Sequence, residues 1–176
     1  MKISKRQKKI LIITVITAAL CAAVFLGLFR LPGYSAPTDR TITDDKTGIT
    51  VIQEGRRVKV LRKDTPIWEL ERDVLAQSVL LGDIDHDGRD DLLVLCWKRG
   101  RFGKHKPTWV AYDEIGYSQH IFIYRIEEDT VRPRWMASDI GMDAVSWEFD
   151  DGVLSITDTE GEVTKWVWRS WGLEKM

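Results

Sequence analysis

The chain has 176 residues, 44% of them hydrophobic, with two cysteines and a formal net charge of −1. This length suits one domain of ordinary size. Six basic and no acidic residues lie in positions 1–30, and removing these six charges from −1 leaves −7 for residues 31–176. An acidic balance of this kind argues against nucleic acid as a partner.

The N-terminal residues predict a membrane anchor. Residues 1–9 are basic, and residues 10–29 form an apolar run of 20 residues without charge. A helix of that length spans roughly 30 Å, the thickness of a bilayer core. We therefore expect a single-pass transmembrane signal-anchor helix over residues 10–29, with residues 1–9 in the cytoplasm and the rest extracytoplasmic, in the cell envelope. A cleaved signal peptide is the alternative, although the run is longer than a usual signal core.

Residues 30–47 contain proline, glycine and serine and predict a linker. Residues 48–176 predict an extracytoplasmic β-domain, because short segments of alternating apolar residues are separated by turns rich in Asp and Gly. The fold class that we expect is therefore all-β. The expected strands are 49–52, 58–61, 66–70, 78–81, 92–97, 120–126, 131–137, 143–149, 153–157 and 162–169.

An acidic loop follows Gly82 and runs into an apolar strand. Acidic side chains this close repel one another unless a cation lies among them, and calcium accepts six to eight oxygen ligands in irregular loops. We predict a Ca²⁺ site in which Arg89 contributes only its backbone carbonyl. The predicted metal ligands, at positions 1, 3, 5, 7 and 9 of the loop, are Asp83, Asp85, Asp87, Arg89 and Asp91. An acidic solvated turn is the alternative.

The loop lacks the features of an EF-hand, since position 12 is Val94 within a strand pattern and not a bidentate acid. The D-x-D-x-D-G-x-x-D run between two strands instead resembles the calcium loop of FG-GAP repeats (the integrin α-subunit propeller, VCBS-like). The resemblance implies a blade of a β-propeller with one structural calcium ion.

A weak internal repeat agrees with that resemblance: segments 79–97 and 121–135 resemble segments 145–157 and 163–171. A propeller normally has four to eight blades, which residues 48–176 cannot supply. We therefore expect a small propeller-like domain of two to three antiparallel blade-like sheets. Its open edges predict self-association or docking on another envelope protein.

Two further groups of residues are candidates for ligand binding. Residues 98–117 are rich in basic side chains that could bind an anionic wall polymer; a solvated loop is the alternative. Two tryptophans near the C-terminus could form a platform for sugar rings, whereas filling of the core is the alternative. The candidate residues are Lys98, Arg99, Arg101, Lys104, His105, Lys106, Trp168 and Trp171.

Catalytic patterns are weak in this chain. There is no G-x-S-x-G elbow, no paired histidine spacing and no phosphate-cradling glycine loop. The expected function is a membrane-anchored binding or scaffolding module, not an enzyme. A carbohydrate or cell-wall-polymer binding module is the second reading, and a hydrolase is a distant third.

Overall fold

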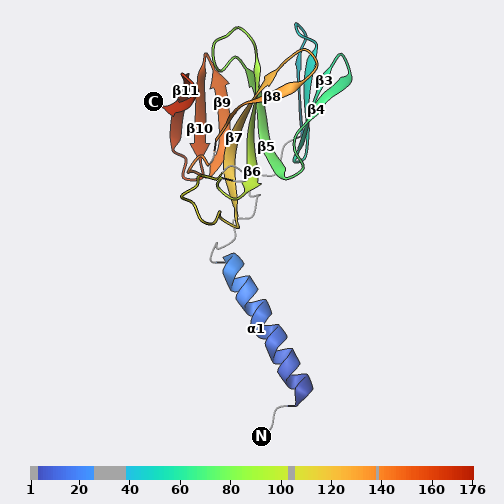
Figure 1. The fold of residues 1–176 in the computed structure, drawn as a ribbon, viewed down its shortest axis with the longest axis vertical. Helices are drawn as coiled ribbons and strands as arrows, with labels where there is room; N and C mark the ends of the chain where they lie inside the picture. Colours follow the sequence, from blue (N-terminus) through green and yellow to red (C-terminus); the bar gives the residue numbers. More distant parts are fainter. Residues whose placement is uncertain (1–3, 26–38, 103–105, 138) are drawn as a thin grey trace.

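The computed structural model describes residues 4–25, 39–102, 106–137 and 139–176. In these ranges the chain forms helix α1 (Lys5–Phe25) and twelve strands in three antiparallel sheets of four (Figure 1). Sheet 1 contains β1 (Arg40–Asp44), β2 (Ile49–Glu54), β3 (Arg57–Arg62) and β4 (Thr65–Glu69). Sheet 2 contains β5 (Val74–Gly82), β6 (Asp91–Arg99), β7 (Tyr117–Ile126) and β8 (Val131–Met136). Sheet 3 contains β9 (Ala144–Asp150), β10 (Val153–Asp158), β11 (Val163–Arg169) and β12 (Gly172–Lys175).

Each sheet is a meander in which four consecutive strands pair in chain order. The hairpin between β9 and β10 shows how the sequence sets the register. Asp150 pairs with Val153 across a two-residue turn, and Asp151 and Gly152 have φ values of 45° and 76°. An Asp-Gly pair with positive φ at both positions is the preferred two-residue hairpin turn. The all-β expectation for the sheet-forming part of the chain is confirmed.

Sheet 2 lies between the other two, with sheet 3 on one side and sheet 1 on the other (Figure 1). One buried cluster joins sheets 1 and 2, and a second joins sheets 2 and 3. Strand β6 contributes to both: Leu92 and Val94 belong to the first, Leu93 and Leu95 to the second. Neighbouring side chains of a strand point to opposite faces, so a strand covered on both faces is apolar throughout.

The predicted transmembrane helix over residues 10–29 is wrong, and the single-pass localisation in a cell membrane is wrong with it. Within the described residues no helix is long and apolar enough to cross a membrane. Helix α1 begins at Lys5 and therefore includes the basic residues of positions 5–9. Within the described residues its uncharged part is Ile10–Phe25, which has 16 residues. Residues 26–29 of the predicted span lie outside the described ranges.

The β-region begins at Arg40 and not at residue 48, because β1 lies in the segment that was expected to be a linker. Residues 30–38 of that segment lie outside the described part. Strand β12 was not expected either. Both strands are short and contain a single large apolar residue each, Ile42 and Leu173, so neither has a visible alternation.

The last strand of each sheet carries a feature that discourages pairing with another chain. Strand β5 contacts β1 and β9, which leaves β4, β8 and β12 at the periphery. Pro66 lies in β4 and Pro133 in β8, and β12 has four residues, including Glu174 and Lys175. Proline cannot donate to a ladder, and short charged edges pair poorly. The predicted self-association through sheet edges stays a prediction, and these features count against it.

Candidate metal site

The acidic loop joins β5 to β6, whose last pair is Gly82 with Asp91. His86 and Gly88 have φ values of 59° and 85°, left-handed conformations that glycine adopts without strain. Three acidic side chains of this loop, Asp83, Asp85 and Asp87, each offer a carboxylate oxygen, and these oxygens lie within 4.8 Å of one another. A cluster with this spacing could hold one metal ion.

Asp83 and Asp87 also stabilise the loop through its backbone. Asp83 Oδ1 accepts a hydrogen bond from the N–H of Asp87 at 3.0 Å, and Asp83 Oδ2 accepts one from Gly88 at 2.8 Å. Asp87 Oδ1 accepts a bond from the N–H of Arg89 at 3.1 Å. Aspartates commonly bond to the backbone in this way in turns. An ordinary acidic turn therefore explains the placement of Asp83 and Asp87, but it does not explain Asp91.

Two arginines that the sequence did not single out lie against the acidic cluster. Arg125 Nη2, from β7, lies 2.9 Å from Asp85 Oδ2 and 2.5 Å from Asp87 Oδ2. Its Nε lies 3.8 Å from Asp91 Oδ1. Arg134, from β8, pairs with Asp85 as well. The register of β6 and β7 places Asp91 opposite Arg125, so the hairpin pairing was the signal that could have identified this residue.

Asp91 is buried, and within the described chain neither of its carboxylate oxygens accepts a hydrogen bond. The Oδ1 atom of Asp85 is buried without a hydrogen-bond partner too. Burial raises the pKa of Asp91 to about 7, Asp85 adds to the rise, and Arg125 opposes it. A buried acceptor without a donor is costly. The protein therefore has acceptor capacity at this point that its own donors do not use.

The charges of the cluster do not balance. When ionised, the carboxylates of Asp83, Asp85, Asp87 and Asp91 carry −4, and the two arginines that pair with them carry +2. The difference of −2 equals the charge of one divalent cation. A set made of carboxylate oxygens suits a hard ion. Of the predicted ligands, the structure brings together Asp83, Asp85 and Asp87; Asp91 lies beside Asp85 but outside that group.

The loop also packs on sheet 3. Ile84 is fully buried in the cluster between sheets 2 and 3. A Cβ atom added to Gly152, in the β9–β10 turn, would collide with the imidazole of His86. A Cβ atom added to Gly82 would collide with the ring of Phe149. The loop therefore fills the space between the ends of two sheets, and its conformation affects how they pack.

The basic residues of the 98–117 segment have separate local partners where the structure describes them. Lys104 and His105 lie outside the described residues. Three of the basic residues lie over aromatic rings: Lys98 over Phe122, Arg99 over Tyr117 and Arg101 over Phe102. Lys106 donates hydrogen bonds to the backbone carbonyl groups of Val110 and Ala111. Lys98 and Arg101 line one hollow together with Glu71 and Asp73, whose charges oppose theirs. Anion binding by this segment stays a prediction.

The two candidate tryptophans have different environments. Trp168 packs against the cluster between sheets 2 and 3, and the guanidinium of Arg134 lies 5.6 Å from the centre of its ring. Trp171 is 78% exposed. Trp168 is therefore half-buried against the core, whereas Trp171 is exposed, and ligand binding by either stays a prediction.

Comparison of the chain with protein-family models, with curated proteins and with solved structures finds no match. The likeness to FG-GAP repeats consequently rests on the acidic loop and its flanking strands. The functional argument has to rest on the geometry: three clustered carboxylates, a fourth buried beside them, and two arginines that balance half of their charge.

Proposed function

We propose that the Asp83–Asp91 loop binds one calcium ion and that the chain is a non-catalytic binding or scaffolding module built on its three sheets. The observation that carries the proposal is Asp91, a buried carboxylate beside Asp85 whose two oxygens accept no hydrogen bond within the described residues. A cation is the simplest partner for such a group.

The residues of the loop fit calcium better than magnesium. Asp83, Asp85, Asp87 and Asp91 would supply carboxylate oxygens, and the Arg89 carbonyl would add one more. Calcium tolerates irregular sets of six to eight oxygens, whereas magnesium requires near-ideal octahedral geometry. The ion would cancel the excess charge of −2 and hold the loop in place between sheets 2 and 3. Its role would be structural.

The burial that favours a metal counts against a hydrolase. A carboxyl group whose pKa is raised by burial and by a neighbouring carboxyl group is typical of an acid–base pair, and Asp91 beside Asp85 has this property. However, the side chain of Asp91 is 1% exposed, and a general acid has to reach the substrate. We therefore favour a binding module, whose partner would be another protein.

Calcium-dependent stability tests this proposal. We expect calcium at a hundred times its dissociation constant to add about 2.7 kcal/mol to the free energy of unfolding, which raises the melting temperature by roughly 5–10 °C. Asp91→Asn should remove this response. Asp90→Asn is the matched control, because Asp90 is the adjacent residue and lines a different hollow, with Asp44.

Thermal unfolding of the three proteins in calcium and in a chelator measures the response. A wild-type melting temperature that calcium leaves unchanged would overturn the metal site. A response in Asp91→Asn as large as in wild type would show that the ion binds elsewhere. Magnesium in place of calcium tests the choice of ion, and we expect a smaller shift.

A further inference from the structure

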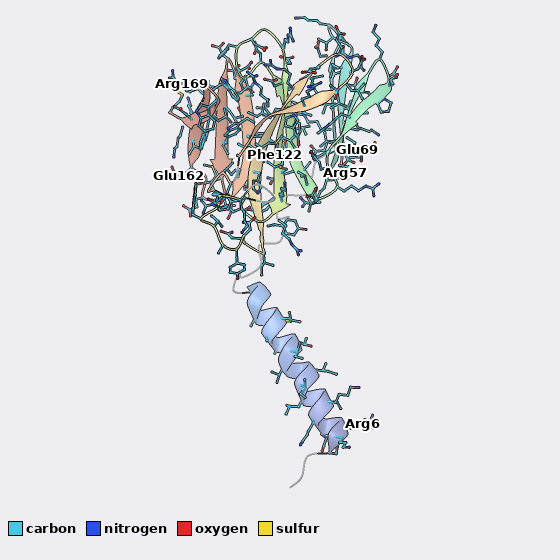
Figure 2. All side chains as sticks on the ribbon, viewed as in Figure 1. Arg6, Arg57, Glu69, Phe122, Glu162 and Arg169 are labelled. Carbon is cyan, nitrogen blue, oxygen red and sulfur yellow. The ribbon has the colours of Figure 1, made fainter. Side chains whose placement is uncertain are left out.

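A second feature of the molecule lies apart from the acidic loop. A hollow of about 340 Å³ lies between β8, with the residues that follow it, and strands β11 and β12. Its walls include three indoles, Trp135, Trp166 and Trp171, together with aliphatic side chains and one carboxylate, Asp139. In Figure 2, β11 runs between the labelled Glu162 and Arg169, and the turn that carries Trp171 follows Arg169.

The turn between β11 and β12 presents Trp171 to solvent. Arg169 pairs with Gly172, so Ser170 and Trp171 form a two-residue turn, and Ser170 has a φ of 48°, a conformation that is uncommon for a residue other than glycine. A Cβ atom at Gly172 would collide with the indole of Trp135. One exposed and one packed tryptophan thus meet at this turn, although large aromatic side chains are usually well buried.

The carboxylate in the wall is fixed and its charge is balanced. Asp139 Oδ1 accepts a hydrogen bond from the N–H of Gly141 at 3.0 Å, and Asp139 Oδ2 lies 3.6 Å from Arg101 Nε. Arg101 reduces the attraction of the hollow for a cation. Among the described residues that line the hollow there is no lysine or arginine, which disfavours an anion. The hollow therefore favours a neutral ligand with apolar and hydroxyl groups.

We propose that this hollow binds a neutral pyranose sugar. The C–H face of a pyranose packs on indole rings, and its hydroxyl groups donate hydrogen bonds, for which Asp139 offers an acceptor. The volume lies at the lower end of the range for small-molecule sites, about 300 to 1,000 Å³, which suits one or two sugar rings. The sugar site is separate from the calcium loop and does not depend on it.

A panel of immobilised neutral mono- and disaccharides, probed with the full chain, tests the proposal. A retained sugar is then titrated at millimolar concentrations by tryptophan fluorescence. We expect Trp171→Ala to weaken binding about tenfold or more, the loss of one stacking contact, and Asp139→Asn to weaken it less. Trp109→Ala is the matched control, because Trp109 is 84% exposed and does not line the hollow. The sugar affinity of this variant should equal that of wild type.

Three outcomes would overturn the proposal: no neutral sugar retained, equal affinity in Trp171→Ala and wild type, or binding of choline or inorganic phosphate in place of sugar. The melting temperature of Trp171→Ala should match wild type, because its side chain is exposed. Should that variant fail to fold, Trp166→Phe, which keeps an aromatic ring in the wall, must still show weaker binding. Repeating the titration in a chelator keeps the result independent of the calcium loop.

Discussion

Two buried polar clusters lie toward opposite ends of β5, and they differ in whether their hydrogen-bonding groups all find partners. Near the start of the strand, Gln77 Oε1 accepts hydrogen bonds from Trp97 Nε1 at 2.8 Å and Gln119 Nε2 at 2.6 Å. Gln119 Oε1 accepts the N–H of Ala144 at 2.6 Å, and both amides donate to the carbonyl of Ala144. These bonds join sheets 2 and 3 through neutral groups.

Beyond the other end of β5, the acidic cluster remains incomplete. Asp91 and the Oδ1 atom of Asp85 have no hydrogen-bond donor in the described chain, although Arg125 and Arg134 lie close by. Carboxamides both donate and accept, so a few of them can satisfy one another, whereas ionised carboxylates only accept. The glutamine cluster can therefore stabilise the fold with its own donors and acceptors. The aspartate cluster depends on positive charge from Arg125, Arg134 and the proposed calcium ion.

The largest effect is expected at the glutamine end. Gln119→Leu should lower the free energy of unfolding by about 3 kcal/mol, because the N–H of Ala144 loses its acceptor in a buried place. Urea denaturation measures the loss, and calcium should not restore it. The matched control is Gln53→Leu, which removes only donors to Gly55 and Gln77 and should cost about 1 kcal/mol. Equal losses of unfolding free energy in the two variants would show that the hydrogen bonds between Gln77, Gln119 and Ala144 do not cause the larger effect.

Arg125→Gln tests whether the aspartate cluster depends on positive charge, which the glutamine cluster does not. Without metal, loss of the guanidinium should cost about 2 kcal/mol, less than the roughly 3–5 kcal/mol for a fully buried ion pair broken from one side, because the Arg125 side chain is 20% exposed. With calcium the cost should shrink and the apparent calcium affinity should rise, because ion and arginine compete for the same carboxylates. Arg132→Gln is the control, as Arg132 pairs with Glu127 at the surface. A loss that is the same with and without calcium would contradict this competition.

The pH dependence should be the smallest effect. The folded-state pKa of Asp91 is about 7, above its ordinary value of 3.8, so the folded state binds the extra proton between these values and stability falls as the pH rises through that window. Metal-free protein should therefore be more stable at pH 6.5 than at pH 8 by an amount on the order of 1 kcal/mol. Asp91→Asn should flatten this slope. A slope unchanged in the variant would assign it to other groups.

The strands were predictable because the alternation of apolar and polar residues is visible within each short segment. Every strand expected from alternation overlaps a strand of the structure, since each lies on a face packed against a neighbouring sheet. The helix boundary was not predictable from the apolar run, because basic side chains continue a helix as readily as apolar ones. Helix α1 therefore begins at Lys5, five residues before the start of the apolar run.

The acidic loop was predictable, and its surroundings were not. Asp83, Asp85 and Asp87 are close in the sequence, so turn chemistry alone brings them together. Arg125 and Arg134 lie beside the acidic loop because of the register between β6, β7 and β8. That register depends on two strand pairings. The meeting of Trp135 with the turn at Trp171 depends on how sheet 3 packs on sheet 2. Contacts between sheets are decided by the whole fold.

The meander topology has a consequence for how the chain reaches this arrangement. Because each sheet uses four consecutive strands, backbone pairing needs only neighbouring segments, and such local contacts form quickly. The order of the three sheets is then set by contacts between them: the two buried clusters and bonds such as Trp147 Nε1 donating to Ser78 Oγ and Arg40 Nη1 donating to the carbonyl of Val79. We therefore expect the strands within each sheet to pair first and the three sheets to pack together afterwards, when the buried clusters and the long-range bonds between sheets form.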